Sequence, residues 1–271
     1  MNTLSPMINK NGRIDFGTHP ALREIPSISL EEMDTIKLMN RIDTKYVTNE
    51  NLLVEILTEA KNKGYRALEI AGTKLCPYIS TYYDTDNLAM YRDHHNKKLV
   101  RQKIRTRMYE NSNTAFLEIK KKNNKGRTKK KRVEIDTAAF SDFRGDEQRN
   151  NFVTQNTGYQ PQDIQPCLQT IFSRITLVNA AKTERLTIDT ALRFVNVLNN
   201  VEKNLGNAVV IELKQDGRAK SEMKNILLDL RVKPLRMSKY CIGTALTNPS
   251  APNHRFKLKI RKIEKIINQK L

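Results

Sequence analysis

Tryptophan is absent from this 271-residue chain, and aromatic residues make up only 6% of it. Proteins that recognise single-stranded nucleic acids usually stack bases on aromatic side chains, so this shortage argues against base recognition. The three cysteines, Cys76, Cys167 and Cys241, lie far apart. Such a scattered, odd-numbered set predicts neither a disulfide framework nor a cysteine-based zinc site, and it fits a reducing cytoplasm.

Long apolar runs are also missing. No segment approaches the roughly 18 apolar residues that a membrane-spanning helix needs. The first residues contain neither the apolar stretch nor the small-residue cleavage site of a secretory signal. Walker and dinucleotide-binding glycine patterns do not occur either. We therefore expect a cytoplasmic protein without a transmembrane segment, whose basic C-terminal stretch is a solvated helix or docks on an anionic membrane.

Positive charge is what the chain has in excess: 48 Lys and Arg stand against 29 Asp and Glu, a net charge of +19. Between Lys97 and Arg132, 15 Lys and Arg accompany only two carboxylates, so this window holds 13 of the 19 net charges. A field focused in this way implies a polyanionic partner, which could be nucleic acid, anionic lipid, a nucleotide or polyphosphate. Composition alone does not choose among them.

Hydrophobic periodicity and turn residues predict one mainly β domain. A helix is predicted over 49–63 with Gly64 after it, and a capping box at Ser29 begins a short helix to about 39. We expect strands over 41–47, 65–71, 78–84, 98–109, 114–122, 128–136, 171–178, 184–189, 194–198 and 208–214, and further helices over 86–95, 137–156 and 218–230. We interpret 1–28 as a loosely structured lead-in, 29–250 as the main domain and 251–271 as a basic C-terminal helix or tail.

The informative feature is the parity of charge in the strands, because side chains two residues apart share a face. Between 100 and 108, one face is Arg101, Lys103, Arg105 and Arg107, and the other is largely uncharged. An ordinary sheet with its charge in water would explain one such strand. A barrel with its charges inside and its apolar face covered by helices explains the whole set better. The alternation recurs in strands that place on one face Arg41, Asp43 and Lys45; Glu118 and Lys120; Lys130, Arg132 and Glu134; Arg185 and Asp189; Glu212 and Lys214.

An interior of this kind favours a chain of phosphates. Two like charges ~6 Å apart repel by roughly 3 kcal/mol at an effective dielectric constant near 20. An empty cavity lined by cations is therefore unfavourable until a polyanion neutralises it. Arginine offers paired donors to phosphate oxygens and lysine a mobile charge. The few carboxylates can hold a hard divalent metal ion, which itself bridges phosphate oxygens.

Several segments, taken in order, resemble the VTC domain, and they span about 35–246 of the chain. They are 41–46 (RIDTKY), 83–92 (YDTDNLAMYR), 103–109 (KIRTRMY), 116–120 (FLEIK), 130–132 (KKR), 172–174 (FSR), 185–190 (RLTIDT), 210–214 (VIELK) and 238–240 (SKY). The resemblance implies the triphosphate tunnel fold, an α+β fold whose antiparallel eight-stranded β-barrel has a basic interior and flanking helices. It also implies a polyphosphate polymerase, which passes the γ-phosphate of ATP to a growing inorganic polyphosphate chain with a divalent metal ion, Mn²⁺ or Mg²⁺.

The resemblance further implies roles for single residues. Catalysis would depend on Arg105, Arg107, Lys239 and Glu212, and Glu212 would be the metal ligand. Lys103 and Arg132 join the phosphate-binding set because they share strand faces with its other members. ATP and the phosphate chain would be held by Lys45, Lys103, Arg105, Arg107, Lys120, Lys130, Arg132, Arg174, Arg185, Lys214, Ser238 and Lys239.

Two departures from the relatives bear on function. The stretch 41–45 (RIDTK) has a single carboxylate where the hydrolytic branch of the fold usually has Glu-x-Glu-x-Lys, which favours the polymerase branch. The regulatory and membrane-spanning segments of larger VTC proteins are missing, so a place at the inner membrane face would need a membrane-protein partner. Two alternatives stay open: a metal-dependent hydrolase of inorganic or nucleoside triphosphates with the same fold, and a nucleic-acid-binding protein that uses 120–132 as a basic hairpin.

Overall fold

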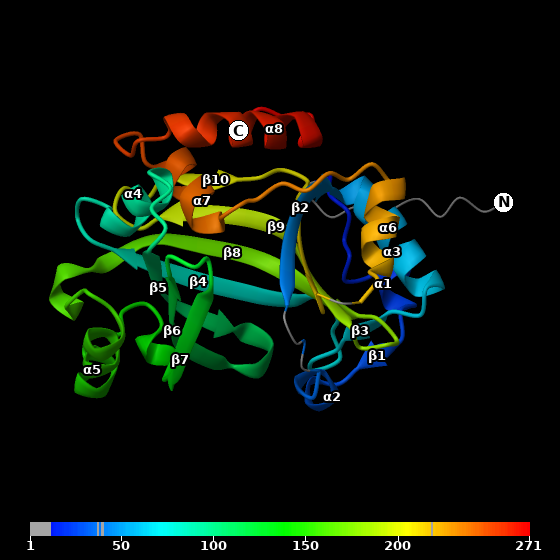
Figure 1. The fold of residues 1–271 in the computed structure, drawn as a ribbon, viewed down its shortest axis with the longest axis horizontal. Helices are drawn as coiled ribbons and strands as arrows, with labels where there is room; N and C mark the ends of the chain where they lie inside the picture. Colours follow the sequence, from blue (N-terminus) through cyan, green and yellow to red (C-terminus); the bar gives the residue numbers. More distant parts are fainter. Residues whose placement is uncertain (1–11, 37, 39–40, 218) are drawn as a thin grey trace.

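The computed structural model describes residues 12–36, 38, 41–217 and 219–271. Its centre is one large sheet whose main path is β2-β11-β9-β8-β4-β5-β6-β7 (Figure 1). Neighbouring strands on this path are antiparallel throughout. The strands are β2 (Ile42–Asn49), β11 (Ala208–Gln215), β9 (Glu184–Asn196), β8 (Gln165–Val178), β4 (Cys76–Asp84), β5 (Arg101–Tyr109), β6 (Thr114–Lys122) and β7 (Thr128–Ile135).

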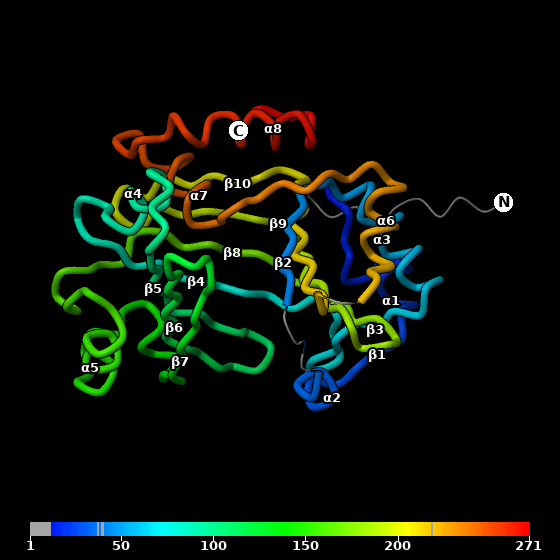
Figure 2. Tube along the Cα trace, viewed as in Figure 1, coloured from blue at the N-terminus to red at the C-terminus, as the bar shows by residue number. Residues whose placement is uncertain are grey.

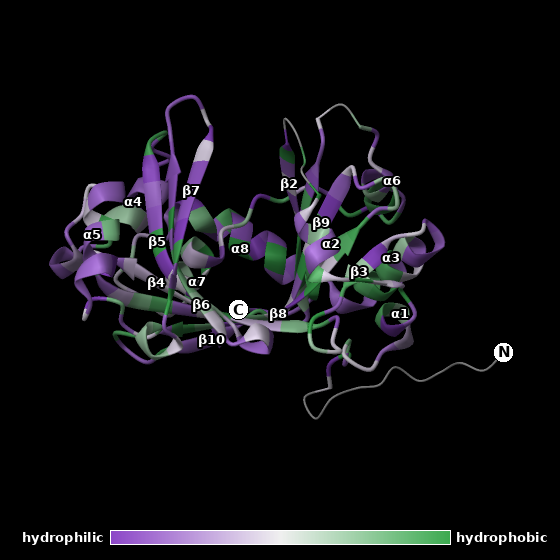
Figure 3. Ribbon diagram, turned by 90° about the horizontal axis from the view of Figure 1, so that it is seen from below, coloured by the Kyte–Doolittle hydropathy of each residue, from purple (hydrophilic) through white to green (hydrophobic). Residues whose placement is uncertain are grey.

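The sheet curves until its two ends face each other. In Figure 3, β5 and β7 stand on one side and β2 and β9 on the other, with β8 running between the two sides. Over the described residues, no backbone pairing joins β7 to β2. The predicted eight-stranded antiparallel barrel with flanking helices is therefore confirmed, as a tunnel-like fold that hydrogen bonds do not close between its first and last strands.

Three short strands extend this path. β1 (Ser27–Ile28) pairs in parallel with β3 (Arg66–Leu68), which also pairs with β8, and β10 (Glu202–Asn204) pairs with β9. The separate strands predicted over 184–189 and 194–198 are wrong, because they form the single strand β9. The pairing of β8 with β9 continues past a register shift between Ile171 and Ser173. Opposite this shift β9 accommodates an extra residue, and Ala191 there has a left-handed φ of 52°.

The predicted helices differ mainly in length. The capping box between Ser29 and Glu32 is present, but its helix ends at Asp34. The region 137–156 is not one helix, because Asp146 caps a new helix by accepting from the backbone N–H of Arg149. The helices are α1 (Pro20–Arg23), α2 (Leu30–Asp34), α3 (Glu50–Asn62), α4 (Ala89–His95), α5 (Glu147–Asn156), α6 (Glu222–Asp229), α7 (Lys239–Thr247) and α8 (His254–Ile267), with 3₁₀ turns at Glu110–Ser112, Thr137–Ala139 and Pro161–Asp163.

Helices cover the outer face of the sheet in two groups. The helices α1, α3 and α6 pack on the side formed by β2, β11 and β9, where Ile188 and Leu213 are fully buried. On the other side, Val153 of α5 packs with Ile104 and Leu117. Each fully buried side chain of this size stabilises the fold by about 1.5–3 kcal/mol. The apolar side chains of the strands therefore pack against helices on the outer face of the sheet. The charged side chains, at the alternate positions, face the inside.

The lead-in predicted over 1–28 lies partly outside the described residues. From residue 12 onward it carries α1, and Phe16, Leu22 and Ile25 are buried against α3 and its neighbours. At the other end of the chain, the segment after α6 returns across the sheet to α7 and then to α8 (Figure 2). In α8, Phe256, Ile263 and Ile267 are buried. The division of the chain into three parts stays a prediction.

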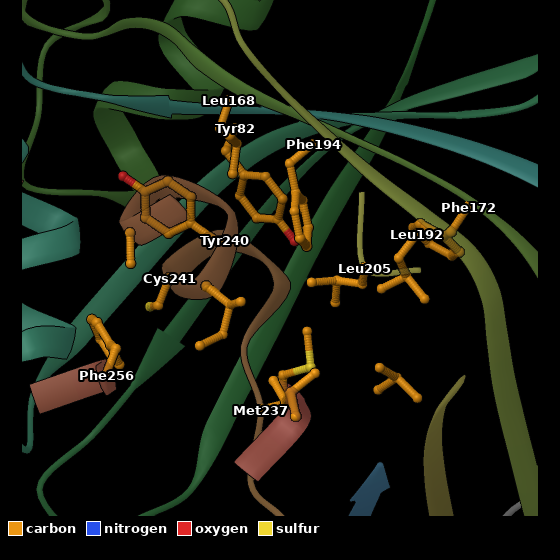
Figure 4. Close-up of a cluster of buried hydrophobic side chains, with 14 of the residues drawn as sticks. Tyr82, Leu168, Phe172, Leu192, Phe194, Leu205, Met237, Tyr240, Cys241 and Phe256 are labelled. Atoms are coloured by element: carbon orange, nitrogen blue, oxygen red, sulfur yellow. The ribbon is translucent and has the colours of Figure 1, made fainter. Parts of the chain in front are cut away.

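The inner face of the sheet is charged along one part and apolar along the other. In the apolar part, Tyr82 stacks on Tyr240 of α7, and Phe172, Phe194 and, from α8, Phe256 lie in the same cluster (Figure 4). The extra residue near Ala191 causes the change in β9, because it moves the inner face from odd-numbered to even-numbered residues. The basic interior therefore ends at a floor made of aromatic side chains and α7. Within the described part of the chain, none of the helices has the length and apolarity required to cross a membrane.

Candidate active site

Strand register places the charged residues of neighbouring strands side by side. Lys45 of β2 pairs with Glu212 of β11, and Arg174 of β8 pairs with Asp189 of β9. On the far side of the tunnel, β5, β6 and β7 repeat the pattern in two adjacent rows. One row is Arg105, Glu118 and Arg132, and the next is Lys103, Lys120 and Lys130.

Glu118 organises the side formed by β5 to β7. Its side chain is fully buried, and it accepts from Nε and Nη2 of Arg105 at 2.8 and 2.6 Å. Lys130 of β7 forms an ion pair with the other carboxylate oxygen. Burial acts to raise the pKa of Glu118, but Arg105, Arg107 and Lys130 outweigh it and hold the pKa well below its usual range. This carboxylate therefore stays charged and keeps Arg105 in place.

Asp189 likewise holds two cations in place, at the floor of the tunnel. Arg174 donates to both of its oxygens, at 2.6 and 2.9 Å, and Lys239 at the start of α7 donates to one of them. Burial acts to raise the pKa of Asp189, whereas the two cations dominate and lower it. Burial likewise lowers the pKa of Lys239 to about 8, although Asp189 opposes that change. Asp189 was placed on the charged face by parity, but no role was predicted for it.

Glu212 is held more loosely. Its side chain is 24% exposed, and its oxygens lie 2.8 Å from Nζ of Lys45 and 3.5 Å from Nζ of Lys214. Burial acts to raise the pKa of Glu212, but Lys45 and Lys214 lower it overall. This carboxylate is charged, and it is more accessible than Glu118 or Asp189.

Four buried or half-buried cations of the predicted phosphate-binding set form no ion pair with any of the described residues: Lys103, Arg107, Lys120 and Arg185. Each has a pKa below its usual value. Burial is the main cause for Lys103, Arg107 and Arg185. Lys120 is shifted furthest, to a pKa of about 6, first by the charge of Arg105 and then by burial. None of these four side chains has a carboxylate partner among the described residues, and the low pKa of Lys120 leaves its amine largely neutral near pH 7.

The two sides of the tunnel are close enough to affect each other. Beyond the effects of Arg105 and burial on Lys120, Glu212 on the opposite side acts to raise its pKa. Beyond burial, Lys45 of β2 acts to lower the pKa of Lys103 of β5. The charged faces of β5–β6 and β2–β11 therefore lie within electrostatic range of each other.

Aromatic rings support the cations near the floor. The guanidinium of Arg107 lies 5.6 Å from the ring centre of Tyr78, and that of Arg174 lies 4.9 Å from the same ring. Lys239 lies 4.5 Å from the ring of Phe172. Contacts of this kind orient a cation without consuming its hydrogen-bond donors. These aromatic residues were not predicted as part of the site, although Tyr78 and Phe172 stand at inner-face parity in their strands.

Two further hydroxyl groups join the site. Ser238 caps α7 by accepting from the backbone N–H of Cys241, and it also accepts from Nζ of Lys103 at 2.9 Å. The hydroxyl of Tyr82 accepts from Nη1 of Arg105 at 3.0 Å. Burial acts to raise the pKa of Tyr82, but Arg105 and other nearby cations lower it to about 8. Ser238 was among the predicted residues and Tyr82 was not.

Arg132 and Lys130 lie at the margin of the site. Arg132 is exposed, and its guanidinium lies 4.6 Å from the ring centre of Phe116. Lys130 reaches Glu118 although more than a third of its side chain, 37%, is exposed. Both belong to β7, the last strand of the path, so one flank of each faces no neighbouring strand. The other predicted phosphate-binding residues are buried or half-buried on the inner side of the sheet or on α7.

The residues present fit a metal site that substrate phosphates help to form, rather than one built from protein ligands alone. Over the residues that the structure describes, no three or more His, Cys, Asp and Glu side chains gather in a metal-binding group. Glu118 and Asp189 are buried between cations, whereas Glu212 is accessible. Asp43, on the same face of β2, is also accessible and forms an ion pair with Arg41. Ions such as Mg²⁺ often bind one or two carboxylates together with substrate phosphates. Glu212 suits that arrangement, with most ligands supplied by phosphate and water.

Comparisons with known proteins agree with this geometry. The VTC-domain family model matches residues 40–248, which is more than half of the chain. No curated protein matches the chain significantly. Among solved structures, a proposed adenylyl cyclase from Hippeastrum, described as having a dominant triphosphatase activity, is similar with a TM-score of 0.50 and 14% identity, over 78% of this chain and 98% of that one.

Two other solved structures are similar over a comparable extent. A proposed adenylate cyclase from Bacillus halodurans has a TM-score of 0.48 and 12% identity, covering 74% of this chain and 96% of that one. A protein from Pyrococcus horikoshii has a TM-score of 0.43 and 16% identity, covering 76% and 98%. At these identities, the likeness of the Hippeastrum protein concerns the fold alone.

Proposed function

This chain belongs to the VTC-domain family, and from that premise we propose that it is a polyphosphate polymerase. It transfers the γ-phosphate of ATP to the end of a growing inorganic polyphosphate chain inside the basic tunnel. A divalent metal ion, Mn²⁺ or Mg²⁺, accompanies the phosphates. The proposal names a reaction, whereas the family match by itself concerns the domain.

The observation that carries the proposal is the set of unpaired cations. Lys103, Arg107, Lys120 and Arg185 line the tunnel without carboxylate partners in the described chain, and all four have lowered pKa values. Concentrated, uncompensated charge of this kind is stabilised by an anion that contacts several cations at once. A linear chain of phosphates meets that need, because it carries a negative charge at every phosphate along an extended path.

Phosphoryl transfer mainly requires positioning and neutralisation of charge. Arg105 and Arg107 would grip the triphosphate from β5, and Lys239 would contact it from the start of α7. The attacking group is an oxygen of the acceptor phosphate, so no nucleophilic side chain is needed. Glu212 would hold the metal ion together with phosphate oxygens, and the ion would neutralise charge on the transferring group.

Hydrolysis of inorganic or nucleoside triphosphates is the second candidate. The same cations would bind those substrates, and a protein with dominant triphosphatase activity shares the fold. Against hydrolysis, Glu118 and Asp189 are buried and paired with cations. The accessible carboxylates are then Glu212 and Asp43, and Asp43 is paired with Arg41. Over the described residues no three or more His, Cys, Asp and Glu gather in one group, which is a weak basis for two metal ions that activate water.

Analysis of the reaction products tests the proposal. The protein is incubated with ATP and MnCl₂, and the products are separated by size on a gel that detects polyphosphate, with free phosphate measured in parallel. Polyphosphate that lengthens with time is the expected result, whereas release of free phosphate alone would assign the chain to the hydrolytic branch. As a control, the double variant Arg105→Glu and Arg107→Glu should bind neither ATP nor tripolyphosphate, because it adds two negative charges beside Glu118.

A further inference from the structure

The first turn of α7 is tied to three different strands by three consecutive residues. Ser238 accepts from Lys103 of β5, Lys239 donates to Asp189 of β9, and the hydroxyl of Tyr240 donates to Asp84 at the end of β4. The first two contacts involve residues assigned to phosphate binding. The third leads away from the tunnel, to a carboxylate for which the proposed reaction has no use.

Asp84 is an unusual place to attach a helix, because it is completely buried. It accepts from the backbone N–H groups of Thr85, Met90 and Tyr91 at 2.8, 2.9 and 2.8 Å, in addition to Tyr240. It forms no ion pair with any of the described residues. Leu88, the N-cap residue of α4, has a φ of 56° and provides no side-chain cap. Asp84 supplies that cap from the preceding strand, so it has a fixed orientation before Tyr240 reaches it.

Tyr240 connects the fixed carboxylate of Asp84 to the phosphate-binding residues. Its side chain is fully buried, and its ring stacks on Tyr82 with the ring centres 4.9 Å apart and the planes 20° from parallel. Figure 4 shows the two rings side by side. The hydroxyl of Tyr82 accepts from Arg105. One unbroken series of contacts therefore links Asp84 to the turn that carries Lys239 and to the guanidinium of Arg105.

We propose that Asp84 is a positioning residue that acts through Tyr240 to hold Ser238, Lys239 and Arg105 in the arrangement that binds phosphates. It does not touch the substrate. The segments 83–92 and 238–240, far apart in the chain, are joined by this hydrogen bond and by the edge contact of the Tyr91 and Tyr240 rings, whose centres lie 6.2 Å apart. Tyr91→Phe keeps that ring contact. This inference rests on the proposed function only for the identity of the bound anion, because the contacts themselves are properties of the protein.

The sharpest test compares two tyrosine hydroxyl groups in the same buried cluster. Tyr240→Phe removes the donor to Asp84 but leaves the three backbone donors that hold the carboxylate. Tyr91→Phe is the matched control, because the Tyr91 hydroxyl donates to the backbone oxygen of Pro252 at 2.9 Å and does not reach the first turn of α7. Tyr91→Phe loses one part-buried hydrogen bond, and Tyr240→Phe loses a buried one together with the weak contact from Sγ of Cys167 at 3.8 Å. Both should therefore lower the melting temperature by a few degrees.

Activity should separate the two variants. We expect Tyr240→Phe to lower kcat with ATP by about tenfold and to weaken binding of tripolyphosphate, since a small displacement of catalytic groups has large effects on rate. Tyr91→Phe should stay within about twofold of wild type in both, as expected for a change outside the catalytic groups. Asp84→Asn should be affected more strongly than Tyr240→Phe, because its amide nitrogen would face backbone donors. If Asp84→Asn does not fold, the comparison of Tyr240→Phe with Tyr91→Phe still tests the positioning role.

Amide hydrogen exchange over 238–242 gives a readout that does not depend on the reaction. Exchange should be faster in Tyr240→Phe than in wild type or Tyr91→Phe. Equal exchange and equal kcat in the two tyrosine variants would overturn the positioning role. If instead wild type binds no tripolyphosphate and makes no polyphosphate, the proposed function fails. In that case the exchange experiment still tests whether Asp84 holds α7.

Discussion

Glu118 on β6 and Glu212 on β11 both lie among cations in the tunnel, yet they are held very differently. The side chain of Glu118 is 0% exposed and is gripped by Arg105 and Lys130, whereas that of Glu212 is 24% exposed and has one close and one longer contact to lysines. A buried carboxylate between two cations is fixed, because separating it from them leaves charges unpaired in a dry environment. A half-exposed carboxylate can exchange a lysine for another cation. The comparison separates a residue that builds the site from one that is available for the reaction.

The largest expected effect is on turnover. Glu212→Gln should lower kcat with ATP and Mn²⁺ by about 100-fold or more, because it removes the accessible carboxylate for the metal ion. Binding of tripolyphosphate without metal should change little, since the cations remain. Steady-state kinetics and calorimetry measure the two quantities. Full activity of the variant would exclude Glu212 as the metal ligand.

The next effect is on stability, where substitution of Glu118 should have a larger effect than substitution of Glu212. Glu118→Gln should reduce the free energy of unfolding by about 3 kcal/mol, because it leaves Arg105 buried without its counter-charge. Glu212→Gln should reduce it by about 1 kcal/mol or less, as is usual for partly exposed ion pairs. Urea denaturation of the two isosteric variants measures the difference. Equal losses would show that the two carboxylates are held alike.

The smallest effect is on proton uptake. The pKa of Lys120 is about 6, mainly because of Arg105 and burial, so its amine is largely neutral at pH 7.5. A bound polyanion favours the charged amine and raises this pKa. Binding should then take up as much as about one proton, and this contribution to affinity should decline as the pH rises above 6.

Calorimetry in buffers of different ionisation enthalpy measures this uptake, with Lys120→Gln as the control that corrects for protonation of the ligand itself. If the control takes up as many protons as wild type, Lys120 is already charged in the empty tunnel. In that case the lysines on the side formed by β5 and β6 would be charged before an anion binds, like those on the side formed by β2 and β11.

Much of the fold could be predicted, because the decisive signal is local. Charge at alternate positions in 101–107 and 212–214 shows which side chains share a face without any knowledge of the neighbouring strands. The helix over 49–63 was recognised from its apolar spacing and the glycine after it. The break between 139 and 147 and the union of two predicted strands in β9 were not, because a helix cap at Asp146 and a register shift beside β8 depend on geometry that periodicity does not record.

The site was predicted less completely than the fold. Each predicted cation on the paired strands lies at the inner-face parity expected of it, and the pairing of segments far apart in sequence then decides which carboxylate it meets. Asp189 was visible as a charge on the inner face of β9, but its bonds to Arg174 and Lys239 join three segments of the chain. Tyr82 and Phe172 carry no charge, so nothing in their own segments marks them as parts of a phosphate-binding site.

By itself, the sequence determined that this protein has strands with one charged and one apolar face, and that the charge is mainly positive. Those properties follow from the two-residue period of a strand and from composition. Only the tertiary structure decided which cations are paired with carboxylates and which remain free for an anion, and how the start of α7 is joined to Asp84. Such contacts depend on distances between strands and helices that lie far apart in the chain.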